Sequence, residues 1–254
     1  MSDELDGRDA GLRMETQFHE DRLIETSRLR YATPAKTGGC TCGSIGAPPE
    51  VRLCEEHHRY WHGDLELISV SKIIRSVWPV KKDFENAPAD VLENAKDRGI
   101  AVDELITKWV NSTMDKIPAG STREDAVPLF EQAVEWINGQ NWSSIKAQVT
   151  LNDKRAAGTC DLIIDGFIWD VKTVYNLDPS YEVQQGMYAK LANGVCKGLG
   201  ILHLNRRFKE PKAIVLDLDR CRRDANLIYD AYFTMMERIT GVPYITDGDL
   251  PEGF

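Results

Sequence analysis

The residue types that could do chemistry in this sequence are gathered at Asp161, Asp170 and Lys172. Paired carboxylates are ligands for a hard divalent cation, and magnesium is the ion that suits them best. A lysine beside them can orient a water molecule or stabilise negative charge that develops on a phosphate. The alternative is an ordinary charged rim in which Lys172 only neutralises Asp170, because the D-x-K spacing is common. The three residues therefore need a structural context before they predict a reaction.

A β-hairpin is the element that would position these side chains. Residues 162–164 and 167–169 are apolar and predict two short strands, and the Asp-Gly pair at 165–166 is typical of a tight turn between them. Asp161 begins the first strand and Asp170 ends the second, so the two carboxylates are expected opposite one another at the open end of the hairpin. The lysine two residues further on leaves the same face of its strand.

A second polar pair follows on the next predicted element. Pro179 ends a loop, and Ser180 is a suitable N-cap for a helix over residues 180–192. Gln184 and Tyr188 are four residues apart and therefore share a face of that helix. An amide and a phenol can hydrogen-bond a phosphate backbone without reading base identity. The alternative is a half-buried helix with two polar side chains.

The three motifs in this order resemble the PD-(D/E)XK nuclease superfamily. They are G-x-x-D at 158–161, D-x-K at 170–172 and Q-x-x-x-Y at 184–188. The last motif is similar to that of the RecB-like branch, which includes phage exonucleases. The resemblance implies an α/β fold with a restriction-endonuclease-like core, in which helices flank a mixed central β-sheet. It also implies a Mg²⁺- or Mn²⁺-dependent deoxyribonuclease, with an exonuclease of DNA recombination, repair or phage DNA processing as the first expectation.

The resemblance assigns a role to each matching residue. Asp161 and Asp170 would hold the catalytic metal, and Lys172 would be the catalytic lysine. Gln184 and Tyr188 would contact DNA and support the site. The implied substrate is DNA, and a recombination or single-strand-binding protein is a candidate partner.

Two positions depart from the pattern of the superfamily. Its members often carry a glycine followed four residues later by histidine on an upstream helix, whereas this chain has Gly99 and Asp103. Asp103 is either a further metal ligand or part of a solvated helix face. The strand before G-x-x-D often carries a glutamate, whereas Gln148 here is a neutral and poorer ligand. These departures keep two alternatives open, a catalytically inactive DNA-binding or assembly subunit and a site-specific endonuclease.

A cysteine and histidine cluster precedes these motifs. Cys40, Cys42, Cys54 and either His57 or His58 could complete a tetrahedral structural zinc site. A segment rich in glycine and proline lacks an apolar core of its own, and bound metal would help it fold. The alternative is a loop with reduced thiols, and an iron–sulfur cluster is less favoured than zinc.

Composition and charge limit the class of protein. The chain has 254 residues, of which 42% are hydrophobic and 28% are charged, and this predicts a globular protein with one substantial core. No apolar run approaches the ~20 residues that span a bilayer, and the first residues do not resemble a secretory signal, so we expect a cytoplasmic protein without membrane contact. The net charge of −9 argues against passive coating of nucleic acid, but it allows an enzyme with a local basic groove. Candidates for local positive charge are Lys81-Lys82, Lys154-Arg155, Arg206-Arg207 with Lys209, and Arg220 with Arg222-Arg223.

The sequence predicts three segments and leaves the oligomeric state open. Residues 1–36 are polar and are expected to be disordered or to bind a partner, 37–63 form the zinc-knuckle-like segment, and 64–254 form the nuclease-like domain. Helices are expected at 69–78, 89–98, 103–111, 128–138 and 224–239, and further strands at 145–151, 199–204 and 213–218. The tryptophans expected in the core are Trp109, Trp136 and Trp142.

Overall fold

The computed structural model describes residues 51–54, 59–63, 65–78, 88–112 and 123–241. They belong to two units, of which Cys42–Tyr229 holds the sheet and the site, and Asp230–Gly241 is the described part of the other. The strands are β1 (Val51–Cys54), β2 (Arg59–His62), β3 (Leu65–Ser69), β4 (Ile145–Asn152), β5 (Ala156–Ile164), β6 (Phe167–Lys172), β7 (Gly198–His203) and β8 (Lys212–Leu216). The helices are α2 (Val70–Val77), α4 (Ala89–Asn111), α5 (Val127–Asn138), α6 (Ser180–Leu191) and α7 (Leu218–Thr240).

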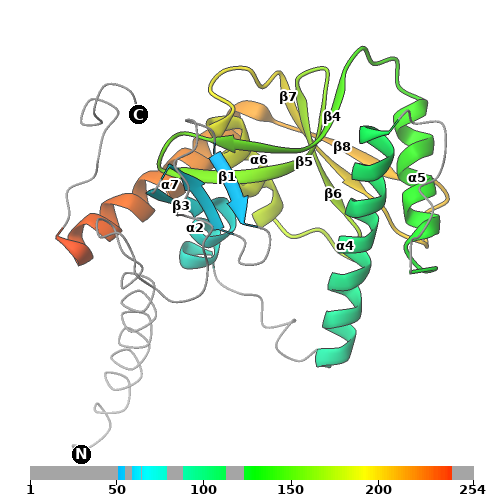
Figure 1. Cartoon of the computed structure of the whole chain (residues 1–254), viewed down its shortest axis with the longest axis horizontal. Helices are drawn as coiled ribbons and strands as arrows, with labels where there is room; N and C mark the ends of the chain where they lie inside the picture. The colour runs from blue at the N-terminus through cyan, green and yellow to red at the C-terminus, as the bar shows by residue number, and fades with distance from the viewer. Residues whose placement is uncertain (1–50, 55–58, 64, 79–87, 113–122, 242–254) are drawn as a thin grey trace, which may run out of the picture. The chain divides into compact units, whose positions relative to one another are not determined.

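The described strands form one mixed sheet in the order β1-β2-β3-β5-β6-β7-β8, with β4 paired to β5 (Figure 1). The pairs β3–β5 and β6–β7 are parallel, and the other pairs are antiparallel. Helix α6 connects the parallel strands β6 and β7, as a crossover connection requires. The expected mixed sheet flanked by helices is therefore observed.

Strand β5 has different neighbours along its length. On one edge it pairs with β4 from Ala157 to Ile164. On the other edge, β3 pairs with Ala156 and Ala157, whereas β6 pairs only with residues 162–164. No described strand pairs with residues 158–161 on this second edge, so the sheet forks between β3 and β6. The G-x-x-D motif lies at this fork.

Helices α4 and α5 pack on one face of the sheet and enclose an apolar core there (Figure 1). Trp109 of α4 meets Phe130 of α5 edge to face, with ring centroids 6.4 Å apart. Trp136 of α5 meets Trp169 of β6 in the same way at 4.7 Å. Trp109 is buried, and Trp136 and Trp142 pack against this core while partly exposed. The sequence-based placement of the three tryptophans is confirmed.

Helix α4 is one continuous helix where the sequence predicted two. Gly99 lies within it, and residues 100–102 continue the helical turn to the buried side chains of Val102 and Leu105. A glycine inside a helix costs only about 1 kcal/mol, and burial of the apolar face after it outweighs this cost. The continuity matters because it fixes Gly99 and Asp103 on one rigid element.

The N-terminus of α6 also differs in detail from the prediction. Pro179 is the N-cap residue, and Ser180 is the first residue of the helix. The Ser180 amide donates to Asp178 Oδ1 at 2.8 Å, so Asp178 takes the capping role. By contrast, Ser69 caps α2 as expected, because its hydroxyl accepts the Lys72 amide at 3.2 Å.

Strands β1 and β2 lie in the segment for which the sequence predicted a zinc knuckle. They form an antiparallel pair in which Cys54 faces Arg59, and β2 pairs onward to β3. The sheet therefore begins within this segment. Cys40, Cys42, His57 and His58 lie outside the described residues, so the zinc site stays a prediction.

The second unit is represented by the C-terminal part of α7, where Tyr232 and Phe233 meet edge to face at 5.2 Å. Within the part of the chain that the structure describes, none of the helices combines the length and the apolar character that crossing a bilayer needs.

Candidate active site

The β5–β6 hairpin has the predicted tight turn. Asp165 and Gly166 have φ angles of 50° and 88°, and positive φ at both central residues is typical of a type I′ turn. The Asp165 carboxylate accepts the amides of Ser143 and Ser144, each at 2.7–3.1 Å, which ties the turn to the chain before β4. The turn sets the register of the hairpin, and one step beyond its last pair places Asp161 opposite Asp170.

Asp161 lies where the ladder is interrupted on both sides. On the β4 side, Gln148 stands opposite it with a φ of 50°, a left-handed conformation that is uncommon for a residue other than glycine. The side-chain amide of Gln148 donates a hydrogen bond to the Asp161 carboxylate. On the β6 side, Asp161 Oδ2 accepts the Val171 amide at 2.7 Å. The Asp161 side chain therefore accepts the Val171 N–H, which in a regular β-ladder would donate to a main-chain carbonyl oxygen.

Asp170 and Lys172 form a close ion pair. Trp169 and Val171 face the α4–α5 core, so the alternating residues Asp170 and Lys172 point to the face that α6 covers. Lys172 Nζ lies 2.6 Å from Asp170 Oδ2 and 4.7 Å from the ring centroid of Tyr181 on α6. Asp170 is only 1% exposed, so its charge has little access to solvent.

Asp103 of α4 belongs to the same electrostatic site. It is partly buried, and the carboxylates of Asp161 and Asp170 and the ammonium of Lys172 all act on its charge. Burial first, and then repulsion by Asp161, raises the pKa of Asp103 well above its ordinary value. Asp103 therefore lies within electrostatic range of the three residues of the hairpin and is only partly exposed. Its role as a metal ligand stays a prediction.

The pKa shifts show an excess of negative charge. Burial, followed by the charge of Asp170, raises the pKa of Asp161 to about 7. Burial also raises the pKa of Asp170, although Lys172 opposes the shift. Burial lowers the pKa of Lys172, but the charges of Asp170 and Asp161 outweigh it and the pKa is raised. One ammonium is therefore set among three carboxyl groups, and an added cation would relieve their repulsion.

Gln184 and Tyr188 lie beside this charge cluster. Gln184 Nε2 donates to Tyr188 Oη at 2.8 Å, so the two residues of the Q-x-x-x-Y motif bind one another. Tyr188 is 4% exposed, and burial together with the charges of Asp170 and Asp161 raises its pKa well above the ordinary value. Tyr188 is therefore enclosed beside the carboxylates, whereas Gln184 stays partly exposed. The contact of both residues with DNA stays a prediction.

Sequence reasoning missed two participants. The first is Tyr181, whose ring lies against the Lys172 ammonium. Its signal was the spacing of seven residues to Tyr188, which puts both tyrosines on one helix face. The second is the Val171 amide, which binds Asp161 and has no signature in sequence.

The donor set fits a hard divalent cation in its chemistry and charge. Asp161, Asp170 and Asp103 offer carboxylate oxygens, which Mg²⁺ and Mn²⁺ prefer. Among the residues that the structure describes, no group of three or more His, Cys, Asp or Glu side chains is already gathered into a metal-binding arrangement. Two carboxylates are enough protein ligands for Mg²⁺, since this ion usually keeps several water or substrate oxygens in its coordination shell.

Comparisons with known proteins give distant structural similarity. No family model and no curated protein matches this chain. A solved structure of an inferred exonuclease from Eubacterium rectale is similar, with a TM-score of 0.42 and 14% identity, covering 73% of this chain and 83% of that one. An alkaline exonuclease from Laribacter hongkongensis has a TM-score of 0.35 and 10% identity, covering 69% of this chain and 92% of that one. Similarity at this level does not assign a function, so the site itself must support one.

Proposed function

We propose that this protein is a Mg²⁺- or Mn²⁺-dependent DNA nuclease that hydrolyses phosphodiester bonds, with exonuclease action as the first form to test. The observation that supports the proposal is the convergence of Asp161, Asp170 and Lys172 with Asp103 at the fork of the sheet. Three carboxyl groups with a single ammonium make a site that favours a cation and, through the cation and the lysine, a phosphate group.

Asp161 and Asp170 would hold the metal, with Asp103 as a further ligand from α4. A bound divalent ion supplies Lewis acidity at a phosphoryl oxygen and charge neutralisation at the leaving oxygen. The protein has to fix these carboxylates, and it does so through the Val171 amide on Asp161 and the Lys172 ion pair on Asp170.

Lys172 would act on the water or the phosphate. Its ammonium is held between Asp170 and the face of Tyr181, so it is a positioned donor. A donor fixed in a largely buried site can orient a water molecule in line with phosphorus and stabilise the charge that develops on the phosphate oxygens. Gln184 and Tyr188 would keep α6, and with it Tyr181, in place.

A second candidate is a catalytically inactive DNA-binding or assembly subunit with the same fold. The observation that favours it is Gln148, since a neutral amide stands beside Asp161 where a carboxylate would strengthen a metal site. A site-specific endonuclease is a further form of the first proposal. Roles in recombination, repair or phage DNA processing, a single-strand-binding partner and an oligomeric state all stay predictions.

The test compares Lys172→Ala with wild type on end-labelled linear DNA during a titration of Mg²⁺ or Mn²⁺. We expect wild type to degrade DNA only with added metal, and Lys172→Ala to cleave at least about 100-fold more slowly with DNA binding largely retained. Lys146→Ala, which removes an exposed lysine of β4, is the matched control and should cleave as wild type does.

Unchanged cleavage by Lys172→Ala would remove the mechanism, and binding without cleavage by wild type at every metal concentration would favour the inactive subunit. A covalently closed circular substrate separates the two forms of nuclease, since an exonuclease leaves it intact and an endonuclease cuts it.

A further inference from the structure

The turn between β7 and β8 is fixed beside the end of β6. His203 Nε2 lies 2.7 Å from the Val174 carbonyl oxygen, and Asn205 donates to the same oxygen at 3.4 Å. From α5, Gln132 Nε2 reaches the carbonyl oxygens of Asn205 and Phe208 at 3.3 and 3.2 Å. This turn is therefore held from both sides in one position relative to the strand that carries Lys172.

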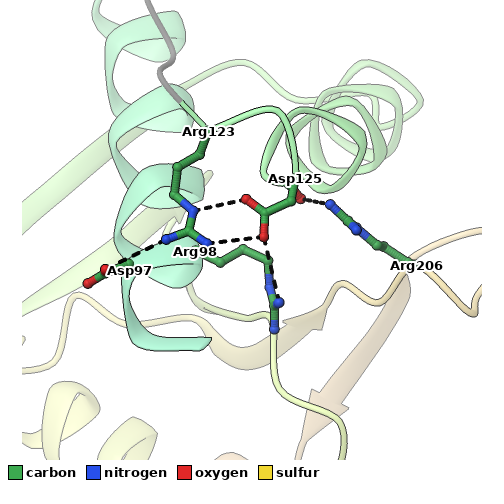
Figure 2. A network of polar contacts seen from close by, with 5 residues as sticks. All are labelled: Asp97, Arg98, Arg123, Asp125 and Arg206. Atoms are coloured by element: carbon green, nitrogen blue, oxygen red, sulfur yellow. Dashed lines mark hydrogen bonds and ion pairs between the residues drawn. The ribbon is translucent and has the colours of Figure 1, made fainter. Parts of the chain in front are cut away.

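Three arginines gather around Asp125, as Figure 2 shows. Arg123 binds Asp125 through its Nε at 2.9 Å and reaches Asp97 at 3.6 Å. Arg98 of α4 lies 3.8 Å from Asp125, and Arg206 of the turn donates to the Asp125 main-chain oxygen at 2.5 Å. Two guanidinium groups thus share the carboxylates of Asp97 and Asp125, and the third binds a main-chain oxygen. With three arginines against two carboxylates, the cluster keeps a net positive charge within a chain of net charge −9.

Tyr175 and Arg207 form an exposed pair next to this cluster. The Arg207 guanidinium lies over the Tyr175 ring at 4.6 Å from its centroid, and its Nη1 donates to the Tyr175 hydroxyl at 2.7 Å. Tyr175 is nevertheless 63% exposed. None of the described carboxylates forms an ion pair with Arg207. An aromatic ring fixed on one face by a guanidinium and open to solvent elsewhere is suited to stacking a base.

This surface is close to the candidate active site along the chain. Tyr175 is three residues beyond Lys172, which limits their Cα separation to about 10 Å. Arg98 is five residues before Asp103 on the same helix, a rise of about 7.5 Å. Positive charge and an aromatic ring one or two nucleotides from the cleavage site fit the path of a substrate strand. Acidic residues are few here: Asp97 and Asp125 are engaged by arginines, and Glu124 and Glu210 are the exposed neighbours in sequence.

We propose that Tyr175 and Arg207, backed by the arginines around Asp125, bind an unpaired stretch of the DNA substrate. The Tyr175 ring stacks on a base, and the guanidinium of Arg207 contacts the neighbouring phosphate. This inference rests on the proposed nuclease function and adds a substrate class, single-stranded DNA or duplex DNA with an unpaired end in preference to blunt duplex. Stacking suits any unpaired base because every base has a π-face, whereas the bases of an intact duplex are already stacked.

The test measures binding of a labelled oligo(dT) and of a blunt duplex of equal length to the full chain, by fluorescence anisotropy without divalent metal. We expect Tyr175→Ala to weaken oligo(dT) binding about tenfold, with an unchanged salt slope and less than a twofold change on the duplex. Tyr175→Trp should retain binding. Arg207→Ala should weaken oligo(dT) binding and reduce the salt slope by about one unit. The controls are Leu227→Ala, which removes an exposed apolar side chain of α7, and Arg238→Ala, which removes an exposed charge from the same helix.

Equal losses on oligo(dT) and blunt duplex, or no loss in Tyr175→Ala, would overturn the inference. Metal-dependent cleavage of the oligonucleotide, measured with the same proteins, keeps the two proposals apart. If wild type cleaves and Tyr175→Ala binds and cleaves equally well, only the stacking site fails. If wild type never cleaves but Tyr175→Ala still loses oligo(dT) binding, the nuclease function fails and the stacking site stands.

Discussion

At the scale of single residues, Gly158 explains why the G-x-x-D motif needs a residue without a side chain. A Cβ atom at this position would lie 2.7 Å from Tyr188 Cε1 and 2.9 Å from Val70 Cγ2. Both separations are shorter than a real carbon contact, so the Tyr188 ring lies directly on the β5 backbone at the fork. The absence of a side chain at Gly158 therefore leaves room for the Tyr188 ring, which lies beside the carboxylates of Asp161 and Asp170.

We predict that Gly158→Ala lowers the free energy of unfolding by roughly 1–3 kcal/mol, because the added methyl displaces Tyr188 or Val70 from a packed site. Gly99→Ala is the matched control. Its Cβ would meet Thr173 Oγ1 at 3.4 Å, an acceptable contact, and alanine in the interior of α4 should stabilise by about 0.5–1 kcal/mol. Urea denaturation of both variants checks the pair, and changes of the same sign would contradict the packing argument.

The residues of the site were predictable from sequence, but the features that shape them were not. Asp161, Asp170 and Lys172 follow from the period of two in a hairpin, and the structure places them together. The left-handed backbone at Gln148 has no local signal, because glutamine has no preference for it and tertiary contacts impose it. Tyr181 became a neighbour of Lys172 only because α6 docks on that face of the sheet.

At the scale of elements, the β5–β6 hairpin is stabilised by the charge of its turn residue. Hydrogen bonds from the hydroxyl and amide of Ser143, and then from Ser144, lower the pKa of Asp165 from its ordinary value to about 2. Since the folded pKa is below the unfolded one, the ionised carboxylate stabilises the fold above about pH 4. That contribution is lost as the pH falls through about 2.

We therefore expect Asp165→Asn to be less stable than wild type at neutral pH, with a difference that shrinks as the pH falls from about 4 toward 2. Asparagine tolerates the left-handed conformation of the turn, so the change isolates the carboxylate charge. Denaturation midpoints across this pH range test the expectation, with Glu131→Gln on the exposed face of α5 as control. A difference that is constant with pH would show that turn geometry, not charge, is responsible.

The prediction of elements succeeded where one signal dominated and failed where two competed. The hairpin, α2 and α5 were predicted because turn residues, a cap and a proline mark their ends. Helix α4 was predicted as two helices, 89–98 and 103–111, whereas the structure has one helix whose buried side chains all lie at Val102 and beyond. Strands β1 and β2 were overlooked because their short apolar alternation lies among cysteines and histidines, which suggested a metal knuckle instead.

At the scale of the whole molecule, the buried carboxyl groups of Asp161 and Asp170 contribute to the formal net charge of −9. A cation that binds only the folded chain must stabilise it, by about 2.7 kcal/mol at a concentration 100 times its dissociation constant. We expect Mg²⁺ or Mn²⁺ to raise the thermal midpoint in a saturable way, as calorimetry or a dye-based melt would measure.

Asp161→Asn should lose most of this metal-dependent rise, since it removes a ligand and part of the repulsion that the ion relieves. Asp219→Asn, an exposed change on α7, should keep it. An equal rise in both variants would place the stabilising ion elsewhere in the molecule. This measurement does not require DNA and so tests the metal site independently of cleavage.

The attachment of β3 to β5 has a consequence for how the molecule opens. Only Ile68 and Ser69 pair with β5, at Ala156 and Ala157, and the Tyr60 hydroxyl adds one bond to Thr159 at 3.0 Å. Because the pairing of β3 with β5 is so short, its hydrogen bonds can break while those between β5, β6 and β7 remain formed. Amide protons of β1 and β2 should then exchange with deuterium well before those of β6, and a protease would first reach the polypeptide on the β3 side of the fork.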